Sequence, residues 1–145
     1  MQKSLLSLVL VAGLVTLFQN CGGHGTDTGN PKTAGGSIAV AACDVLVPCN
    51  PGLTVAVCRE GLRNQSGIPA QIGLNGYSTL VEVEQAELLN QLTPDETNWH
   101  ACTTEIRAQL CTDAAVLGAY NGASNTPFYG APAMIPQTGA CPRVF

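Results

Sequence analysis

The sequence predicts a small all-α fold: a disulfide-stapled bundle of four or five short helices with an irregular Pro/Gly-rich C-terminal tail. Three observations favour it: apolar residues at helical spacing, repeated helix-capping signals, and an even number of cysteines after residue 36. The chain has 145 residues, which allows one small domain. An exported domain of this size commonly relies on disulfides, because its hydrophobic core is modest.

The first two helices are expected on either side of a turn. Ser37 can cap an almost wholly apolar helix over residues 38–47, which Pro48 would end because proline cannot continue the backbone hydrogen bonds. The Asn-Pro-Gly sequence at 50–52 predicts a turn, and Thr54 can cap a second short helix.

An irregular connection over residues 64–76 precedes two helices with stronger start signals. Thr79 and Glu82 fit a capping box that opens a helix to about Leu92. Residues 93–96, Thr-Pro-Asp-Glu, combine a cap, a proline and two acids, and open a helix of about 17 residues. The expected buried stripes are Val81, Leu88 and Leu92 in the former helix, and Trp99, Cys102, Ile106 and Leu110 in the latter.

The last part of the chain is expected to be mostly irregular. Thr112 and Asp113 can restart a short helical turn, but the four prolines and three glycines after residue 121 forbid a long helix or a central strand. The tail would wrap over the helices and be held by Cys141. Phe128 and Tyr129 are expected to pack with it, although an exposed interaction patch is the alternative.

The cysteine spacing predicts structural disulfides, with no free thiol in the globular part. No Cys-x-x-Cys occurs, which argues against redox, haem and common zinc motifs. Six cysteines allow 15 connectivities. Helix geometry excludes Cys102 with Cys111, about 13.5 Å apart along one helix, and disfavours Cys43 with Cys49. The favoured pairs are Cys43–Cys102, Cys49–Cys58 and Cys111–Cys141.

The N-terminus carries the pattern of a secretory signal. Lys3 precedes an apolar run over residues 5–18, too short at about 21 Å to span a bilayer, and Cys21 follows it. This segment resembles the lipoprotein signal peptide of bacterial lipoproteins. Its lipobox, Phe-Gln-Asn-Cys at 18–21, departs from the usual pattern of Leu followed by small residues. It is similar to lipoboxes of certain predatory Gram-negative bacteria.

The resemblance implies three segments: a signal peptide over 1–20, a lipid-anchored flexible tether over 21–36, and a helical disulfide-rich domain over 37–145. Acyl chains such as palmitate on Cys21 would anchor the chain, and Gly22 in place of an acid implies sorting to the outer membrane, on its periplasmic or surface face. The alternative is ordinary signal cleavage, with Cys21 as a free or disulfide-bonded thiol. His24 in the Gly- and Thr-rich tether has no neighbouring ligand and is interpreted as solvated.

Charge and motifs give no sign of catalysis. A net charge of −4 with 11% charged residues argues against nucleic acid as a partner. The acids between residues 78 and 113 predict a solvated face, and no metal or other cofactor is expected. Glu96 and His100, at i and i+4, are interpreted as a surface ion pair rather than a catalytic dyad. Serine-hydrolase and nucleotide-binding motifs do not occur.

The sequence therefore predicts a lipid-anchored, exported cell-envelope protein with a binding or structural role, and not an enzyme. Its expected partners are the membrane, through the lipid anchor, and an envelope protein. An inhibitor of an envelope hydrolase, a lysozyme or a protease, is one alternative, because disulfides preorganise a binding loop. A small envelope enzyme is the other.

Overall fold

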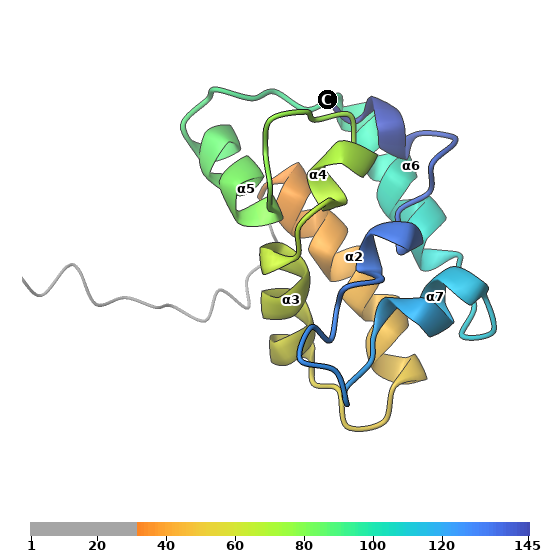
Figure 1. Cartoon of the computed structure of the whole chain (residues 1–145). Coiled ribbons are helices and arrows are strands. Elements are labelled where there is room, and N and C mark those ends of the chain that lie inside the picture. The colour runs from red at the N-terminus through yellow and green to blue at the C-terminus, as the bar shows by residue number, and fades with distance from the viewer. Residues whose placement is uncertain (1–31) are drawn as a thin grey trace, which may run out of the picture.

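The computed structural model describes residues 32–145, so the signal peptide, Cys21 and most of the proposed tether lie outside the described residues. Within this range the chain forms six α-helices and two short 3-10 helices, and no strand (Figure 1). The predicted all-α, disulfide-linked fold is confirmed. The elements are α2 (Ala34–Cys49), α3 (Val55–Asn64), α4 (Ile68–Gln71), α5 (Leu80–Leu88), α6 (Glu96–Arg107), α7 (Ala114–Ala119), η2 (Ala131–Met134) and η3 (Cys141–Arg143).

Helix α2 is the centre of the domain. It contacts α3, α5, α6 and α7, and ten of its 16 residues are buried. Its sequence is almost wholly apolar, which suits a helix that contacts several others. Small residues let its neighbours approach closely: a Cβ on Gly35 would lie 3.2 Å from Cγ of Glu84 on α5.

The start of α2 differs from the prediction. The cap is Thr33, whose hydroxyl accepts a hydrogen bond from the Gly36 amide at 3.1 Å, and not Ser37. Residues 34–36 are buried in the first turn. The predicted tether boundary at residue 36 is therefore wrong, because a glycine-rich segment can form helix where close packing against α5 stabilises it.

The end of α2 also extends beyond the prediction. The helix continues through Pro48 to Cys49. At this end Asn50 supplies two hydrogen bonds, from its side chain to the Leu46 carbonyl at 2.8 Å and from its backbone to the Val47 carbonyl at 3.3 Å. These bonds satisfy carbonyls that a helix end leaves open.

Helices α3 and α4 follow. The predicted cap of α3 is confirmed, since the Thr54 hydroxyl accepts from the Val57 amide at 3.3 Å. The connection over 64–76, expected to be irregular, contains the four-residue α4, which begins after Gly67 at φ 89°. Ile68 and Pro69 are buried there, so tertiary packing holds a helix too short to be stable alone.

Helix α5 has the predicted start but a different buried face. The Thr79 hydroxyl accepts from the Glu82 amide at 3.4 Å, and the Glu82 carboxylate accepts from the Ser78 amide at 2.7 Å. The helix ends at Leu88, before Asn90 in the left-handed conformation at φ 56°. The buried residues are Leu80, Val83 and Ala86, whereas Val81 and Leu92 are half-buried and Leu88 is exposed.

Helix α6 is shorter than predicted. Its cap is Asp95, not Thr93, and the Asp95 carboxylate accepts from the Asn98 amide at 2.8 Å. The helix ends at Arg107, so Leu110 lies beyond it and is exposed. Cys102 and Ile106 are buried as expected, whereas Trp99 is half-buried at the edge of the core.

The C-terminal segment packs over the helices, as predicted, through one close aromatic contact. Phe128 is buried while its neighbour Tyr129 is exposed. A Cβ on Gly61 of α3 would lie only 2.0 Å from Cε2 of Phe128, so the ring occupies the space that a side chain at 61 would need. Glycine at this helical position is required by packing rather than by backbone conformation.

The disulfides join residues other than those we favoured. The bonds are Cys43–Cys58, Cys49–Cys111 and Cys102–Cys141, with Cα atoms 5.8, 5.3 and 4.6 Å apart. The favoured pairs Cys43–Cys102, Cys49–Cys58 and Cys111–Cys141 are wrong.

The cause is helix length. Because α2 continues through Pro48, Cys43 and Cys49 point to different neighbours about 120° apart around the axis. Because α6 ends at Arg107, Cys111 lies in the following loop and reaches Cys49. The two pairs that geometry excluded or disfavoured do not form.

Candidate functional site

The acidic residues between 78 and 113 are all exposed or half-buried, as a solvated face requires, and most of them also bind backbone amides. Five carboxylates accept such hydrogen bonds, at 2.7 to 3.1 Å for the closest contact of each. They are Glu82 to Ser78, Glu87 to Ala34 and Gly35, Asp95 to Asn98, Glu105 to Ala140, and Asp113 to Leu110. Carboxylates suit the exposed amides of helix starts and turns.

One of these carboxylates forms what we call the α2 clamp, the contact of Glu87 with the first turn of α2. Its two oxygens accept from the amides of Ala34 at 2.7 Å and Gly35 at 3.1 Å. Beside it, Glu84 pairs with Arg63 of α3 through two bonds of 2.7 Å. The clamp joins the point where the chain enters the domain to the last turn of α5.

Partial burial raises the pKa of Glu87 above its ordinary value of 4.5, and the nearby Glu84 carboxylate contributes in the same direction. The hydrogen bonds from Ala34 and Gly35 oppose this change but do not cancel it. Sequence reasoning missed the clamp because its partners are more than 50 positions apart, which no local pattern reveals.

The Glu96 and His100 pair lies on the surface of α6. Nε2 of His100 is 3.7 Å from Oε1 of Glu96, and the two side chains are 66% and 82% exposed. The His100 ring stacks on Trp99 with centroids 5.0 Å apart. The predicted surface contact is confirmed, and no third ionisable residue joins it in the hydrogen bonds of this region.

The cysteines offer disulfides of two kinds. Cys43–Cys58 and Cys102–Cys141 are buried, with every half-cystine at most 2% exposed. Cys49 is half-buried and Cys111 exposed, so this third bond is accessible to a reductant. Between residues 32 and 145, no cluster of three or more His, Cys, Asp or Glu side chains is arranged to hold a metal ion.

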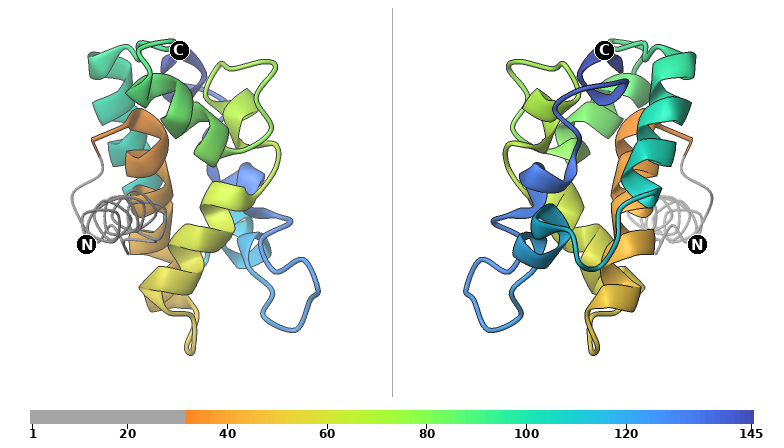
Figure 2. Two further views of the ribbon diagram at one scale, coloured as in Figure 1. Left: turned by 90° about the vertical axis from the view of Figure 1, so that its left-hand side faces the viewer. Right: turned by 90° about the vertical axis from the view of Figure 1, so that its right-hand side faces the viewer.

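A projecting loop, residues 121–127, is the most distinct surface feature (Figure 2). The Asn121 amide donates to the Pro127 carbonyl at 2.8 Å, and the Tyr120 and Phe128 rings meet at the base with centroids 5.0 Å apart. Inside the loop, the Ala123 amide donates to the Asn121 side chain at 3.1 Å. These contacts give a compact loop with a fixed shape and an exposed tip.

Large apolar side chains are exposed in separate places on the surface. Leu88 and Leu89 are adjacent at the end of α5 and are 68% and 66% exposed. Leu117 on α7 and Tyr129 after the projecting loop are 69% and 79% exposed. We call Leu88 and Leu89, which lie beside the α2 clamp, the tip of α5.

None of the helices in the part described has the length and apolar character needed to cross a membrane.

Comparison with known proteins adds no relative. No protein-family model, no curated protein and no solved structure matches the chain. The geometry and chemistry of its own residues therefore carry the functional argument.

Proposed function

We propose that this chain is a lipid-anchored, exported protein of the bacterial cell envelope, with a binding or structural role. The observation that carries the proposal is the number of cysteines that are left outside the disulfides. Of seven cysteines, six are consumed in three disulfides, which leaves Cys21 without a partner in the described domain. That cysteine directly follows the apolar signal segment, where the lipoprotein pattern places the acylated residue.

The disulfides support export independently of the signal pattern. Three structural disulfides in one small domain are typical of oxidising compartments and rare in the cytosol. Two of them are buried in the core, so the native packing is built around them. The secretory signal pattern and the disulfides therefore both favour export to an oxidising compartment.

Mass spectrometry of the N-terminal peptide from native membranes tests the anchor. We expect a mature chain that begins at an acylated Cys21. The control is Cys21→Ala, which should leave the membrane fraction while its three disulfides stay intact. An unmodified N-terminus, or a Cys21→Ala chain that remains firmly bound to the membrane, contradicts the proposal.

A binding or structural role fits the surface better than catalysis. The six cysteines of the domain are bonded, and its single histidine is mostly exposed beside Glu96. We propose the outer membrane as the location because Gly22 follows the acylated cysteine. Crosslinking in intact cells, followed by identification of the captured envelope protein, tests the role. Turnover of a substrate by the purified domain would overturn it.

The projecting loop favours a second candidate, an inhibitor of an envelope hydrolase. A loop closed by hydrogen bonds and an aromatic pair loses little conformational entropy on binding, as a rigid inhibitor requires. Inhibition assays with a lysozyme and with proteases test this role. Asn125→Arg in the exposed loop should abolish inhibition, while Gln85→Arg on the exposed face of α5 should not. Equal inhibition by both variants would exclude the projecting loop as the inhibitory surface.

A further inference from the structure

We infer that the tip of α5, Leu88 and Leu89, is a second and non-covalent membrane contact, with which the anchored domain rests on the surface of a phospholipid bilayer. This inference rests on the proposed lipid anchor at Cys21. It adds which face of the domain meets the membrane and which side chains make the contact.

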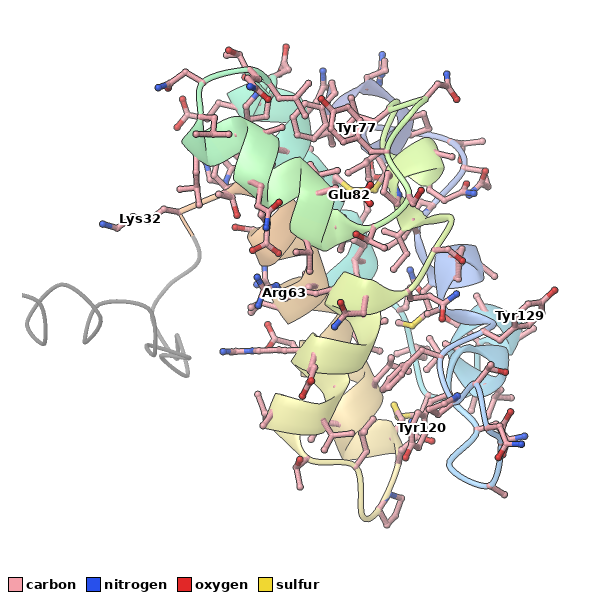
Figure 3. All side chains as sticks on the ribbon, turned by 60° about the vertical axis from the view of Figure 1, so that its left-hand side comes forward. Lys32, Arg63, Tyr77, Glu82, Tyr120 and Tyr129 are labelled. Carbon is pink, nitrogen blue, oxygen red and sulfur yellow. A yellow bond between two sulfur atoms is a disulfide. The ribbon has the colours of Figure 1, made fainter. Side chains whose placement is uncertain are left out.

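The anchored chain joins the domain close to the tip of α5. Thr33 and Ala34 are buried, and Glu87 holds the amides of Ala34 and Gly35. Leu88 is the next residue after Glu87. The exposed leucines and the start of the folded chain therefore lie at the same end of the molecule, and Figure 3 shows Lys32 directed away from the domain at this end.

The length of chain between the anchor and this end limits the distance between this end and the bilayer. Twelve residues, Cys21 to Lys32, span at most about 40 Å even when fully extended. The folded part has an expected radius of gyration of about 13 Å. The end that carries the tip of α5 therefore lies within about 40 Å of the bilayer, a distance comparable to the size of the domain.

The side chains at the tip of α5 have the chemistry of a membrane contact. Leu88 and Leu89 are about two-thirds exposed, and side chains of this kind enter the boundary between headgroups and acyl chains. The acids nearby are neutralised or occupied: Glu84 pairs with Arg63, and Glu87 binds backbone amides. Exposed Lys32 can extend its ammonium group to lipid phosphates. A lipid surface therefore fits this end.

The test attaches the lipid chemically, so it does not depend on acylation in cells. The oxidised chain from Cys21 to Phe145 is coupled through its one free thiol to a maleimide lipid in vesicles with brominated acyl chains. In a Trp99→Phe background, Leu88→Trp places a fluorophore at the tip. Leu117→Trp is the matched control, because Leu117 is 69% exposed on α7, away from α5 in Figures 1 and 2.

We expect strong bromine quenching of the tryptophan introduced by Leu88→Trp, and none with Leu117→Trp. Equal quenching at both positions, or none at the tip, overturns the inference. A protein partner would then be the alternative contact of the two leucines. If the tip variant misfolds, hydrogen exchange of the unsubstituted chain replaces it. The amides of Leu89 and Asn90 should then exchange more slowly on vesicles than with a non-lipid maleimide cap, and equal rates overturn the contact. An unacylated Cys21 in cells would refute the anchor alone.

Discussion

The two ends of α2 are held by different chemistry. At the N-terminal end the Thr33 cap and the α2 clamp hold the helix through hydrogen bonds. Toward the C-terminal end Cys43 and Cys49 hold it through disulfides to α3 and to the loop after α6. We therefore expect a reductant to weaken the attachment of the C-terminal end of α2, and a change of pH to affect the attachment of its N-terminal end.

The largest expected effect is loss of the Cys49–Cys111 bond at the covalent end. This bond closes a loop with a sequence separation of 62, which the chain-entropy relation converts to about 4 kcal/mol of stabilisation. Cys49→Ser/Cys111→Ser should lower the free energy of unfolding by about that amount, measured by urea denaturation. The exposed location of Cys111 keeps any cavity contribution small.

The matched comparison is Cys43→Ala/Cys58→Ala, whose sequence separation is 15. The same relation gives about 3 kcal/mol for this loop, before any cost from the buried cavity. If both double variants unfold at the same urea concentration as the parent, covalent attachment does not stabilise this end of α2.

The order of reduction should separate the disulfides next. With a graded concentration of a small thiol under native conditions, we expect Cys49 and Cys111 to be alkylated well before the four buried half-cystines. Peptide mapping by mass spectrometry identifies the sites. Simultaneous labelling of all six would mean that the domain opens cooperatively before any bond is reduced.

A smaller effect is expected at the clamped end. Glu87→Ala removes both acceptors from the first turn of α2 and should cost about 1 kcal/mol, the usual value of a helix cap. The control is Glu96→Ala, because Glu96 is 82% exposed, and its effect should stay within about 0.5 kcal/mol. Equal losses in the two variants would remove the distinction between a clamp and a surface carboxylate.

The smallest effect is the pH dependence of the clamp. Burial raises the pKa of Glu87 in the folded chain above 4.5, so the folded state binds its proton more tightly than the unfolded state does. This contribution to stability is complete below pH 4.5 and is lost as the pH rises through the folded pKa.

The Glu87→Gln variant has no ionisable side chain at position 87, so it does not lose this contribution to stability as the pH rises. Its free energy of unfolding, relative to the parent, should therefore increase between acidic and neutral pH. Denaturation series at both pH values measure the difference. A parent and variant that change in parallel would show that Glu87 has no part in the pH response.

Local signals in the sequence located the starts of α3 and α5 but not the contacts between distant residues. Thr54 and Thr79 cap helices as expected, because a cap depends on residues within one turn. Phe128 and Gly61 meet through tertiary packing, and the partners of Glu87 lie on another helix. Such contacts leave no periodic trace in a single sequence.

The disulfide pairing failed for a related reason. Two helix ends were misplaced by a few residues, at Pro48 and beyond Arg107, and each shift changed the neighbour of a cysteine. A cysteine requires its partner within about 7 Å, so an error of less than one helical turn is enough to change the pairing. The anchor at Cys21 remains a prediction from the signal pattern.

The Phe128 ring seated on Gly61 has a consequence for how this domain can vary during evolution. Any side chain at position 61 would overlap the ring, so the two positions are constrained together although they are distant in the sequence. In divergent homologues, glycine at 61 should be retained wherever an aromatic residue occupies 128, and a larger residue at 61 should appear only with a smaller one at 128. Together with the order and spacing of the six cysteines, this coupled pair gives a signature for finding relatives whose overall identity is too low to detect.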